Sequence, residues 1–416
     1  MECIRILSLK LFKSISLTSI DSYIFSLIFF LLSVIAAREL SIEDLGRFSV
    51  IMSVYLLHQS IFISCVGEGH VIYNSKELIK PDSLGFSILI SILICIIISL
   101  LSIPLFLMPL GLSLFEVFIV CMTIIFIILA QNFRYYFLSE DRPIAAARVG
   151  LIISCVTALW LFLGPKFQYL DPALRIFTSL GVGAIAAIVY SMPKLDANFS
   201  TANSVAFLKI RFGFLKKAGA LNFSIWASGN LPWVILGTYL NPSLLGIIRG
   251  CLTIINPLQT VERGFTNSLL IQVNASRSST SILTVILRRY IALIAMVYGV
   301  CITLWFWQSE AIIGYTIGLK FIDYSNLISI LILIPFFQAV TSFSSAVLKT
   351  YSIFGVQILT YLVTPLIMLL IVIINSDATN PRNIIIGMFC IAVFQAFAVS
   401  TFLYWAISSK KLTEND

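Results

Sequence analysis

Two arginines lie inside one apolar segment of this chain, and their spacing places them on one face of a helix. The polar residues within about 80° of that face are Arg249, Thr253, Asn256, Thr260, Arg263 and Asn267, with Gln259 at its edge. An arginine at the centre of a membrane helix costs about 2.5–3.5 kcal/mol, so we expect this face to line a water-filled cavity. Guanidinium groups there suit a phosphate or carboxylate ligand. The alternatives are ion pairs with Glu116 or Glu262, and snorkelling of Arg249 to the membrane surface.

A second polar face occurs in the preceding apolar segment. The residues within about 80° of each other are Asn222, Trp226, Asn230 and Trp233. Indole rings beside amides suit a sugar, because the apolar face of a pyranose stacks on the ring while its hydroxyls need amide partners. We therefore predict that these residues face a glycan; the alternative is helix packing with an interfacial tryptophan belt.

Arg47 is a further candidate for binding an anion. It lies at the end of another apolar segment and shares a helical face with His58, which could titrate near neutral pH. The alternative is that Arg47 anchors to lipid headgroups and that His58 is packed and neutral. No acidic residue falls at the centre of the first or seventh apolar segment, which argues against a carboxylate site for cationic drugs.

No catalytic, metal or cofactor site is predicted. The sequence contains no G-x-x-x-x-G-K-[ST], H-E-x-x-H or G-x-S-x-G motif. Its two histidines cannot form a His-rich site, and its eight cysteines show no C-x-x-C spacing. The protein is therefore not expected to be an enzyme, and transport would depend on a gradient.

The elements that hold these residues are predicted to be membrane-spanning helices. Hydrophobic residues make up 59% of the 416 residues and charged residues 11%, a composition that excludes a soluble globular fold. Since a span needs about 20 apolar residues, we predict an all-α polytopic membrane protein of about twelve spans. The predicted spans are 20–37, 48–66, 84–107, 114–132, 145–163, 174–192, 219–240, 246–270, 286–306, 326–348, 352–375 and 384–407, with a short interfacial helix at 311–321.

The distribution of basic residues among the loops predicts the orientation of the chain in the membrane. Most of the 27 lysines and arginines fall in loops on one side, which we assign to the cytoplasm together with both termini. The formal net charge of +8 is therefore explained by membrane topology. The expected partners of the basic residues are membrane lipids, and the charge does not indicate nucleic-acid binding. The first apolar segment is predicted to be a retained helix, because no small-residue cleavage site precedes Asp21.

The chain is predicted to consist of two halves of six helices. These are residues 1–195 and 219–416, joined by a cytoplasmic amphipathic segment at 196–218 that mixes aromatic and basic residues. Leu45-Gly46 matches Leu245-Gly246, and Gln59-Ser60-Ile61 matches Gln259-Thr260-Val261, each 200 residues later. Such matches favour parallel repeats that enclose a central site.

Two stretches carry a resemblance to a known family. Ile35–Phe48 (IAARELSIEDLGRF) and Trp233–Gly246 (WVILGTYLNPSLLG) resemble the corresponding hairpins of bacterial polysaccharide flippases, including Wzx-type O-antigen transporters of the MOP (multidrug/oligosaccharidyl-lipid/polysaccharide) exporter superfamily. The resemblance implies two six-helix bundles in a V around a cavity, as in MATE transporters. It also implies a polyprenyl-diphosphate-linked oligosaccharide as substrate, the bacterial inner membrane as location, and a polysaccharide polymerase and chain-length regulator as partners. Asn230 stands where relatives often carry an acid, which puts proton coupling through a carboxylate in doubt.

Two other functions compete with a flippase. A polytopic glycan polymerase would share the span number, but such enzymes usually need a large outer loop, and the outer loops near 164–172 and 308–324 are short. A MATE-type antiporter of drugs or metabolites is the other alternative.

Overall fold

Helix is the regular structure throughout the described part of the chain. The computed structural model describes residues 24, 26–67, 83–107, 110–140, 142–163, 170–194, 216–217, 219–231, 234, 242–259, 280–350, 355–374 and 380–408. No strand occurs among these residues, and eight of their helices are long and apolar enough to cross a membrane. The predicted class, an all-α multi-pass membrane protein, is therefore confirmed. The number of twelve spans and the two six-helix bundles stay predictions.

The chain divides into two compact units. The first comprises Met1–Phe29, Arg47–Trp226 and Gly237–Tyr239, and the second comprises Phe30–Gly46, Ala227–Leu236 and Leu240–Asp416. Within the described residues, the boundaries between the units fall inside helices, after Phe29, Gly46 and Trp226. The predicted linker at 196–218 lies almost wholly outside the described residues, and the halves 1–195 and 219–416 stay a prediction.

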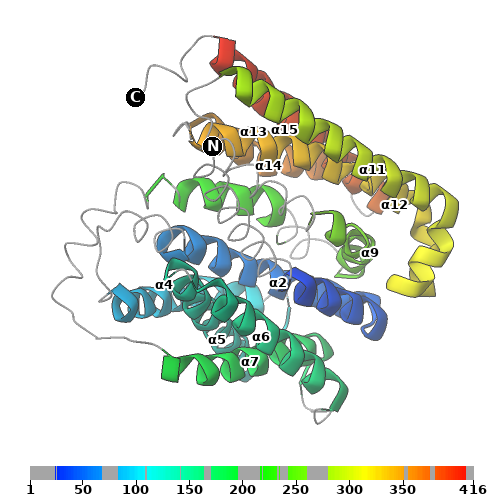
Figure 1. The fold of residues 1–416 in the computed structure, drawn as a ribbon. Helices are drawn as coiled ribbons and strands as arrows, with labels where there is room; N and C mark the ends of the chain where they lie inside the picture. Colours follow the sequence, from blue (N-terminus) through cyan, green and yellow to red (C-terminus); the bar gives the residue numbers. More distant parts are fainter. Residues whose placement is uncertain are drawn as a thin grey trace. The chain divides into compact units, whose positions relative to one another are not determined.

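The first unit is a bundle of long apolar helices (Figure 1). Its helices are α2 (Ile42–Phe62) from Arg47 onward, continued by one π-helical turn, α4 (Ser83–Leu107), α5 (Leu114–Ser139), α6 (Pro143–Leu163) and α7 (Pro172–Ser191). Helix α7 packs on both α5 and α6, and α4 packs on α5. The α6–α7 contact is close because a Cβ on Gly183 would lie 2.6 Å from the carbonyl oxygen of Ile153. Small residues at such crossings are typical of membrane helices.

Local signals in the sequence fix where two of these helices begin. Ser113 accepts a hydrogen bond from the backbone of Glu116, whose carboxylate accepts one from the backbone of Ser113, so a capping box starts α5. Asp171 caps α7 by accepting from the backbone of Ala173, with Pro172 at the first helical position. These two caps place carboxylates at the same region of the first unit, since Glu116 also accepts from the backbone of Asp171.

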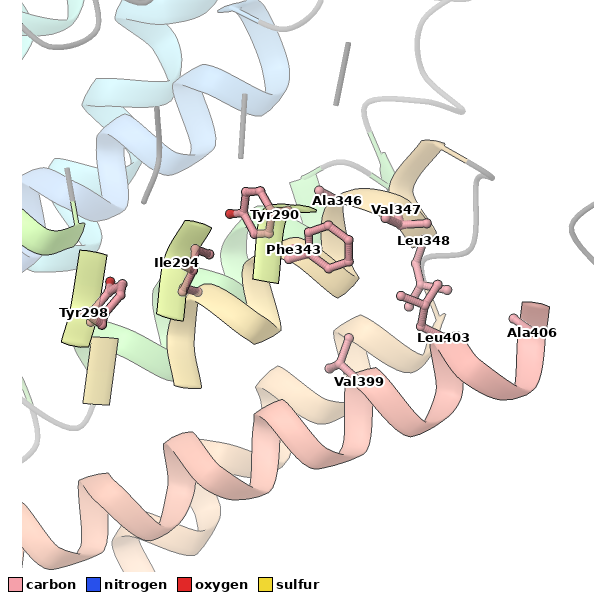
Figure 2. Close-up of a cluster of buried hydrophobic side chains, with 11 residues drawn as sticks. Tyr290, Ile294, Tyr298, Phe343, Ala346, Val347, Leu348, Val399, Leu403 and Ala406 are labelled. Atoms are coloured by element: carbon pink, nitrogen blue, oxygen red, sulfur yellow. The ribbon is translucent and has the colours of Figure 1, made fainter. Parts of the chain in front are cut away.

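The second unit contains the remaining labelled helices. They are α9 (Pro242–Thr253), α11 (Thr280–Thr316), a 3-10 helix (Leu319–Tyr324), α12 (Ser325–Leu331), α13 (Ile334–Thr350), α14 (Gly355–Ile374) and α15 (Pro381–Ser408). Helix α15 packs against α13 and α14, and α9 packs against α12, α15 and the 3-10 helix. A cluster of buried apolar side chains joins α11, α13 and α15, as Figure 2 shows for Tyr290, Phe343 and Leu403.

Two predicted elements can be compared with the structure. The backbone of Gln308 is not helical, so the part of α11 after it is a short helix of its own, and a 3-10 helix follows at Leu319–Tyr324; the interfacial position of the helix predicted at 311–321 stays a prediction. The predicted span at 246–270 is not one regular helix over its described part. Helix α9 ends at Thr253, and Ile255 donates to the carbonyl of Leu252 in a tighter turn. Pro257 explains this break, because it lacks a backbone donor and disfavours helical geometry at the residue before it.

The internal repeat corresponds to a reciprocal contact. A Cβ on Gly46 would lie 2.0 Å from the carbonyl oxygen of Pro242, and one on Gly246 would lie 1.8 Å from that of Ile42. All four residues belong to the second unit, and Gly246 and Pro242 each lie 200 positions after their equivalents, Gly46 and Ile42. The two matched segments therefore cross backbone against backbone, which requires glycine at both equivalent positions.

Candidate functional site

Arg249 lies in α9 inside the second unit. Its Nε atom is shielded from solvent and has no hydrogen-bond partner in the described part of the chain, although the residue as a whole is half-buried. The next residue, Gly250, is pressed against Phe321, since a Cβ there would lie 2.2 Å from the ring. This contact fixes the position of α9 and therefore that of Arg249. A guanidinium with a shielded Nε and some exposed surface is suited to receive an anionic ligand.

One of the two expected carboxylate partners of Arg249 is engaged elsewhere. Glu116 accepts hydrogen bonds from the backbone and hydroxyl of Ser113 and from the backbone of Asp171. Glu262, the other expected partner, lies outside the described residues. Within the described part of the chain, Arg249 therefore has no carboxylate partner.

The remaining members of the predicted arginine face are only partly described. Gln259 donates from Nε2 to Oε1 of Gln338 in α13, at 3.0 Å. Asn256 follows the break after α9, so the shared face computed for one continuous helix does not extend regularly from Arg249 to Asn256. Arg263 lies outside the described residues, as do Thr260 and Asn267. An anion site that combines these residues stays a prediction.

Arg47 forms an ion pair in the first unit. Its Nη1 lies 3.2 Å from Oδ2 of Asp171, and the two side chains are 33% and 11% exposed. The other carboxylate oxygen of Asp171 accepts from the backbone of Ala173 at 2.8 Å, so one carboxylate both caps α7 and holds the arginine. His58, predicted on the same face as Arg47, is fully buried, with its ring nitrogens against the carbonyl of Val54 and the hydroxyl of Ser99.

Two of the four predicted glycan-facing residues pack against α2. The side-chain amide of Asn222 donates to the hydroxyl of Ser64 at 2.8 Å, and its backbone carbonyl accepts from Ser60 at 2.8 Å. The indole N–H of Trp226 donates to the carbonyl of Ser53 at 2.9 Å, and the residue is 7% exposed. These are contacts of helix packing, the alternative interpretation of this face.

The other two residues of that face are Asn230 and Trp233. Asn230 is half-buried near the end of the helix at 219–231, and Trp233 lies outside the described residues. A glycan-facing role for the four residues stays a prediction.

Several buried glutamines were missed in the sequence. Gln395 in α15 donates to the hydroxyls of Ser228 and Thr364, both at 2.6 Å, and Gln357 in α14 donates to the carbonyl of Ser345 at 3.1 Å. In the first unit Gln131 donates to the hydroxyl of Tyr55 at 2.7 Å. The signal was available, since each glutamine interrupts an apolar run, and polar side chains in membrane helices are usually bonded across helices. Among the described residues, no group of three or more His, Cys, Asp or Glu side chains is placed to hold a metal.

Comparisons with known proteins define the fold. No protein-family model matches the sequence, and neither does any curated protein. The lipid II flippase MurJ in an inward closed conformation has a TM-score of 0.68 at 15% identity, covering 93% of this chain and 87% of its own. A multidrug-resistance MATE transporter of the MOP superfamily, in an inward-facing conformation, has a TM-score of 0.66 at 13% identity, covering 96% of both chains.

A MOP superfamily transporter from Pyrococcus furiosus also has a TM-score of 0.66 at 13% identity, over 96% of both chains. The chain has the fold of the MOP superfamily transporters. In a MOP fold the apolar helices described above are membrane helices, so the protein is a multi-pass membrane protein whose structural neighbours transport or flip their substrates.

Proposed function

We propose that the protein is a flippase for lipid-linked oligosaccharides. It moves a polyprenyl-diphosphate-linked repeat unit, such as that of an O-antigen, across the bacterial inner membrane by alternating access. Both termini are cytoplasmic in this proposal, and a polysaccharide polymerase and a chain-length regulator use the flipped product. The protein makes and breaks no covalent bond.

The observation that carries the proposal is the environment of Arg249. Its Nε is shielded from solvent and unpartnered within an apolar unit, and none of the described carboxylates neutralises it. A charge in such a position is retained when a ligand or water compensates for its lost hydration. A diphosphate supplies several acceptor oxygens for a guanidinium fork, whereas a cationic drug would be repelled.

The fold supports this class of function without choosing its substrate. One neighbour is a lipid II flippase and others are multidrug-resistance MATE transporters, with similar TM-scores. Arg249 favours the anionic substrate over a cationic drug. A polymerase remains the enzyme alternative, and an antiporter remains the transport alternative.

Substitution of Arg249 tests the proposal. We expect Arg249→Ala to lower the flipping of a fluorescent lipid-linked oligosaccharide in proteoliposomes by about tenfold or more, because a hydrogen bond to a charged group contributes about 1.5–3 kcal/mol. Arg249→Lys keeps the charge but loses the fork and should retain part of the activity. In cells that lack the native copy, Arg249→Ala should leave less polysaccharide at the surface.

Arg382→Ala is the matched control, because Arg382 is exposed at the start of α15. It should insert into membranes and flip the substrate as the unmodified protein does. Full flipping by Arg249→Ala, at an equal amount of inserted protein, would contradict the anion-binding role. Drug export without any flipping would favour the antiporter, and sugar polymerisation by the purified protein would favour the enzyme.

A further inference from the structure

The second unit contains an apolar cavity of about 140 Å³ between α11, α13 and α15. Its deep wall is formed by Tyr290, Ile294, Phe343 and Leu403, each at most 7% exposed. Figure 2 shows these four side chains in the cluster that joins the three helices. The rings of Tyr290 and Phe343 lie 4.7 Å apart, so the wall is firmly packed and the cavity is part of the fold.

The two serine hydroxyls that line the cavity are hydrogen-bonded to each other. The hydroxyls of Ser344 and Ser400 lie 3.1 Å apart, one from α13 and one from α15. They leave no strong demand for a polar ligand, and the rest of the lining is aliphatic or aromatic. The cavity therefore suits a hydrocarbon chain.

The cavity opens on a surface that belongs in the membrane. Two of its lining residues, Ile291 and Tyr404, are 45% and 75% exposed and mark its mouth. Further along α11, Met296 and Val300 are 61% and 55% exposed, on a helix apolar enough to span the membrane from Arg288 onward. Lipid chains are the apolar molecules present at such a surface, so the occupant of this cavity is a lipid chain.

A basic residue lies close to the mouth of the cavity. Arg288 is exposed and lies three residues before Ile291, so the two side chains are neighbours on the surface of α11. At about 100° per residue, Arg288 lies about 115° and Arg289, which is also exposed, about 150° from the middle of the lining face formed by Tyr290, Ile291 and Ile294. Arg288 is therefore the nearer of the two basic side chains to the rim of the cavity at Ile291. Basic groups beside pockets between membrane helices bind anionic headgroups.

We propose that this cavity binds an acyl chain of an anionic phospholipid, with the lipid phosphate held by Arg288. The described lining residues all belong to the second unit. A ligand whose contacts come from one unit does not depend on how the two units are arranged, so it shifts no equilibrium between arrangements. That property suits a resident lipid better than a transported substrate, which has to exchange its contacts during transport.

Photo-crosslinking tests this site in the complete protein. The probe is phosphatidylglycerol with a diazirine in one acyl chain, in vesicles that are otherwise phosphatidylcholine. We expect labelled residues to concentrate at 336–344 in α13 and 400–404 in α15, and unlabelled phosphatidylglycerol to compete where phosphatidylcholine does not. Arg288→Ala should lower this labelling by about fivefold, the share expected of one arginine near an anionic surface.

Arg289→Ala is the control and should change labelling by less than about twofold, because its side chain lies further round α11 from the rim at Ile291. Val340→Phe adds a ring to the cavity lining and should abolish the label. If that variant does not fold, competition between unlabelled lipids and the photo-crosslinking probe on the unmodified protein still tests the proposal. Labelling spread evenly over exposed apolar residues, equal competition by both lipids, or equal effects of Arg288→Ala and Arg289→Ala would each overturn the proposal. Stronger competition by a polyprenyl phosphate would assign the cavity to the lipid carrier of the substrate instead.

Discussion

Gly46 and Gly246 hold equivalent positions in one helix crossing, each with its Cα against a backbone carbonyl of the other segment. A Cβ on Gly46 would lie 2.0 Å from the oxygen of Pro242, and one on Gly246 would lie 1.8 Å from the oxygen of Ile42. Contact between backbones cannot be relieved by a rotamer change. The two segments must therefore separate if either glycine gains a side chain, and they must do so symmetrically.

Alanine at either glycine is expected to destabilise the protein. We predict that Gly46→Ala and Gly246→Ala each lower the free energy of unfolding by about 1–3 kcal/mol, as overpacking usually does. The measurement is the thermal unfolding midpoint of each purified variant in one detergent. Gly299→Ala is the control: it is helical in α11 and a Cβ there meets nothing within 4 Å, so it should be neutral or slightly stabilising. Unchanged midpoints for both crossing variants would contradict the reciprocal contact.

The repeat could be seen in the sequence, but its structural meaning could not. Equal spacing showed that Leu45-Gly46 and Leu245-Gly246 match. Nothing local indicates that two segments 200 residues apart touch, because helix periodicity describes one helix at a time. The same limit hid the partner of Arg47, since its guanidinium lies 3.2 Å from Asp171, 124 residues later.

Some local signals were present in the sequence but were not used in the prediction. Asp171 before Pro172 is typical of a capped helix start, and Pro257 is typical of an interruption, although one continuous span was predicted at 246–270. The apolar composition was sufficient for the all-helical membrane class. The polar face of Asn222 and Trp226 was identified from its spacing, but spacing cannot tell a glycan from a neighbouring helix, since both satisfy amides and indoles.

Conservative substitutions separate packing from glycan binding at this face. Trp226→Phe keeps the ring but removes the N–H that donates to the carbonyl of Ser53, and we expect it to cost about 1 kcal/mol of stability. Asn222→Ala should cost a similar amount, because the hydroxyl of Ser64 loses its donor. If packing is the role, both variants unfold at lower temperature and retain flipping per folded molecule in proteoliposomes. Normal unfolding temperature with reduced flipping would instead indicate contact with the glycan.

The ion pair of Arg47 and Asp171 makes a separate prediction. Arg47→Ala and Asp171→Asn should each cost at most about 1 kcal/mol, because the arginine is one-third exposed. Asparagine still accepts from the backbone of Ala173, whereas Asp171→Ala loses the cap of α7 as well and should cost about 0.5–2 kcal/mol more. Unfolding midpoints of the three variants test this order.

Transport measurements on the same variants test whether Arg47 also binds substrate. A purely structural pair predicts equal flipping by Arg47→Ala and Asp171→Asn, since each removes the same contact. If Arg47 binds an anion, Arg47→Ala should lower flipping, whereas Asp171→Asn leaves the guanidinium in place and should preserve it. A large loss in both variants would mean that the start of α7 itself matters for transport.

The contact between Gly250 and Phe321 links the packing of α9 to the placement of Arg249. Phe321 is fully buried, and a Cβ on Gly250 would lie 2.2 Å from its ring, so Gly250→Ala must displace either the ring or the helix. We predict that Gly250→Ala lowers stability by about 1–3 kcal/mol and also lowers flipping, because Arg249 moves with α9.

The variant Phe321→Leu removes part of the ring that a Cβ on Gly250 would meet. Combined with Gly250→Ala, it should cost less than the sum of the two single changes, and this coupling is measured from unfolding midpoints. Additive costs would mean that the ring and the glycine do not constrain each other. Recovery of flipping in the double variant would show that the position of Arg249, more than overall stability, limits transport.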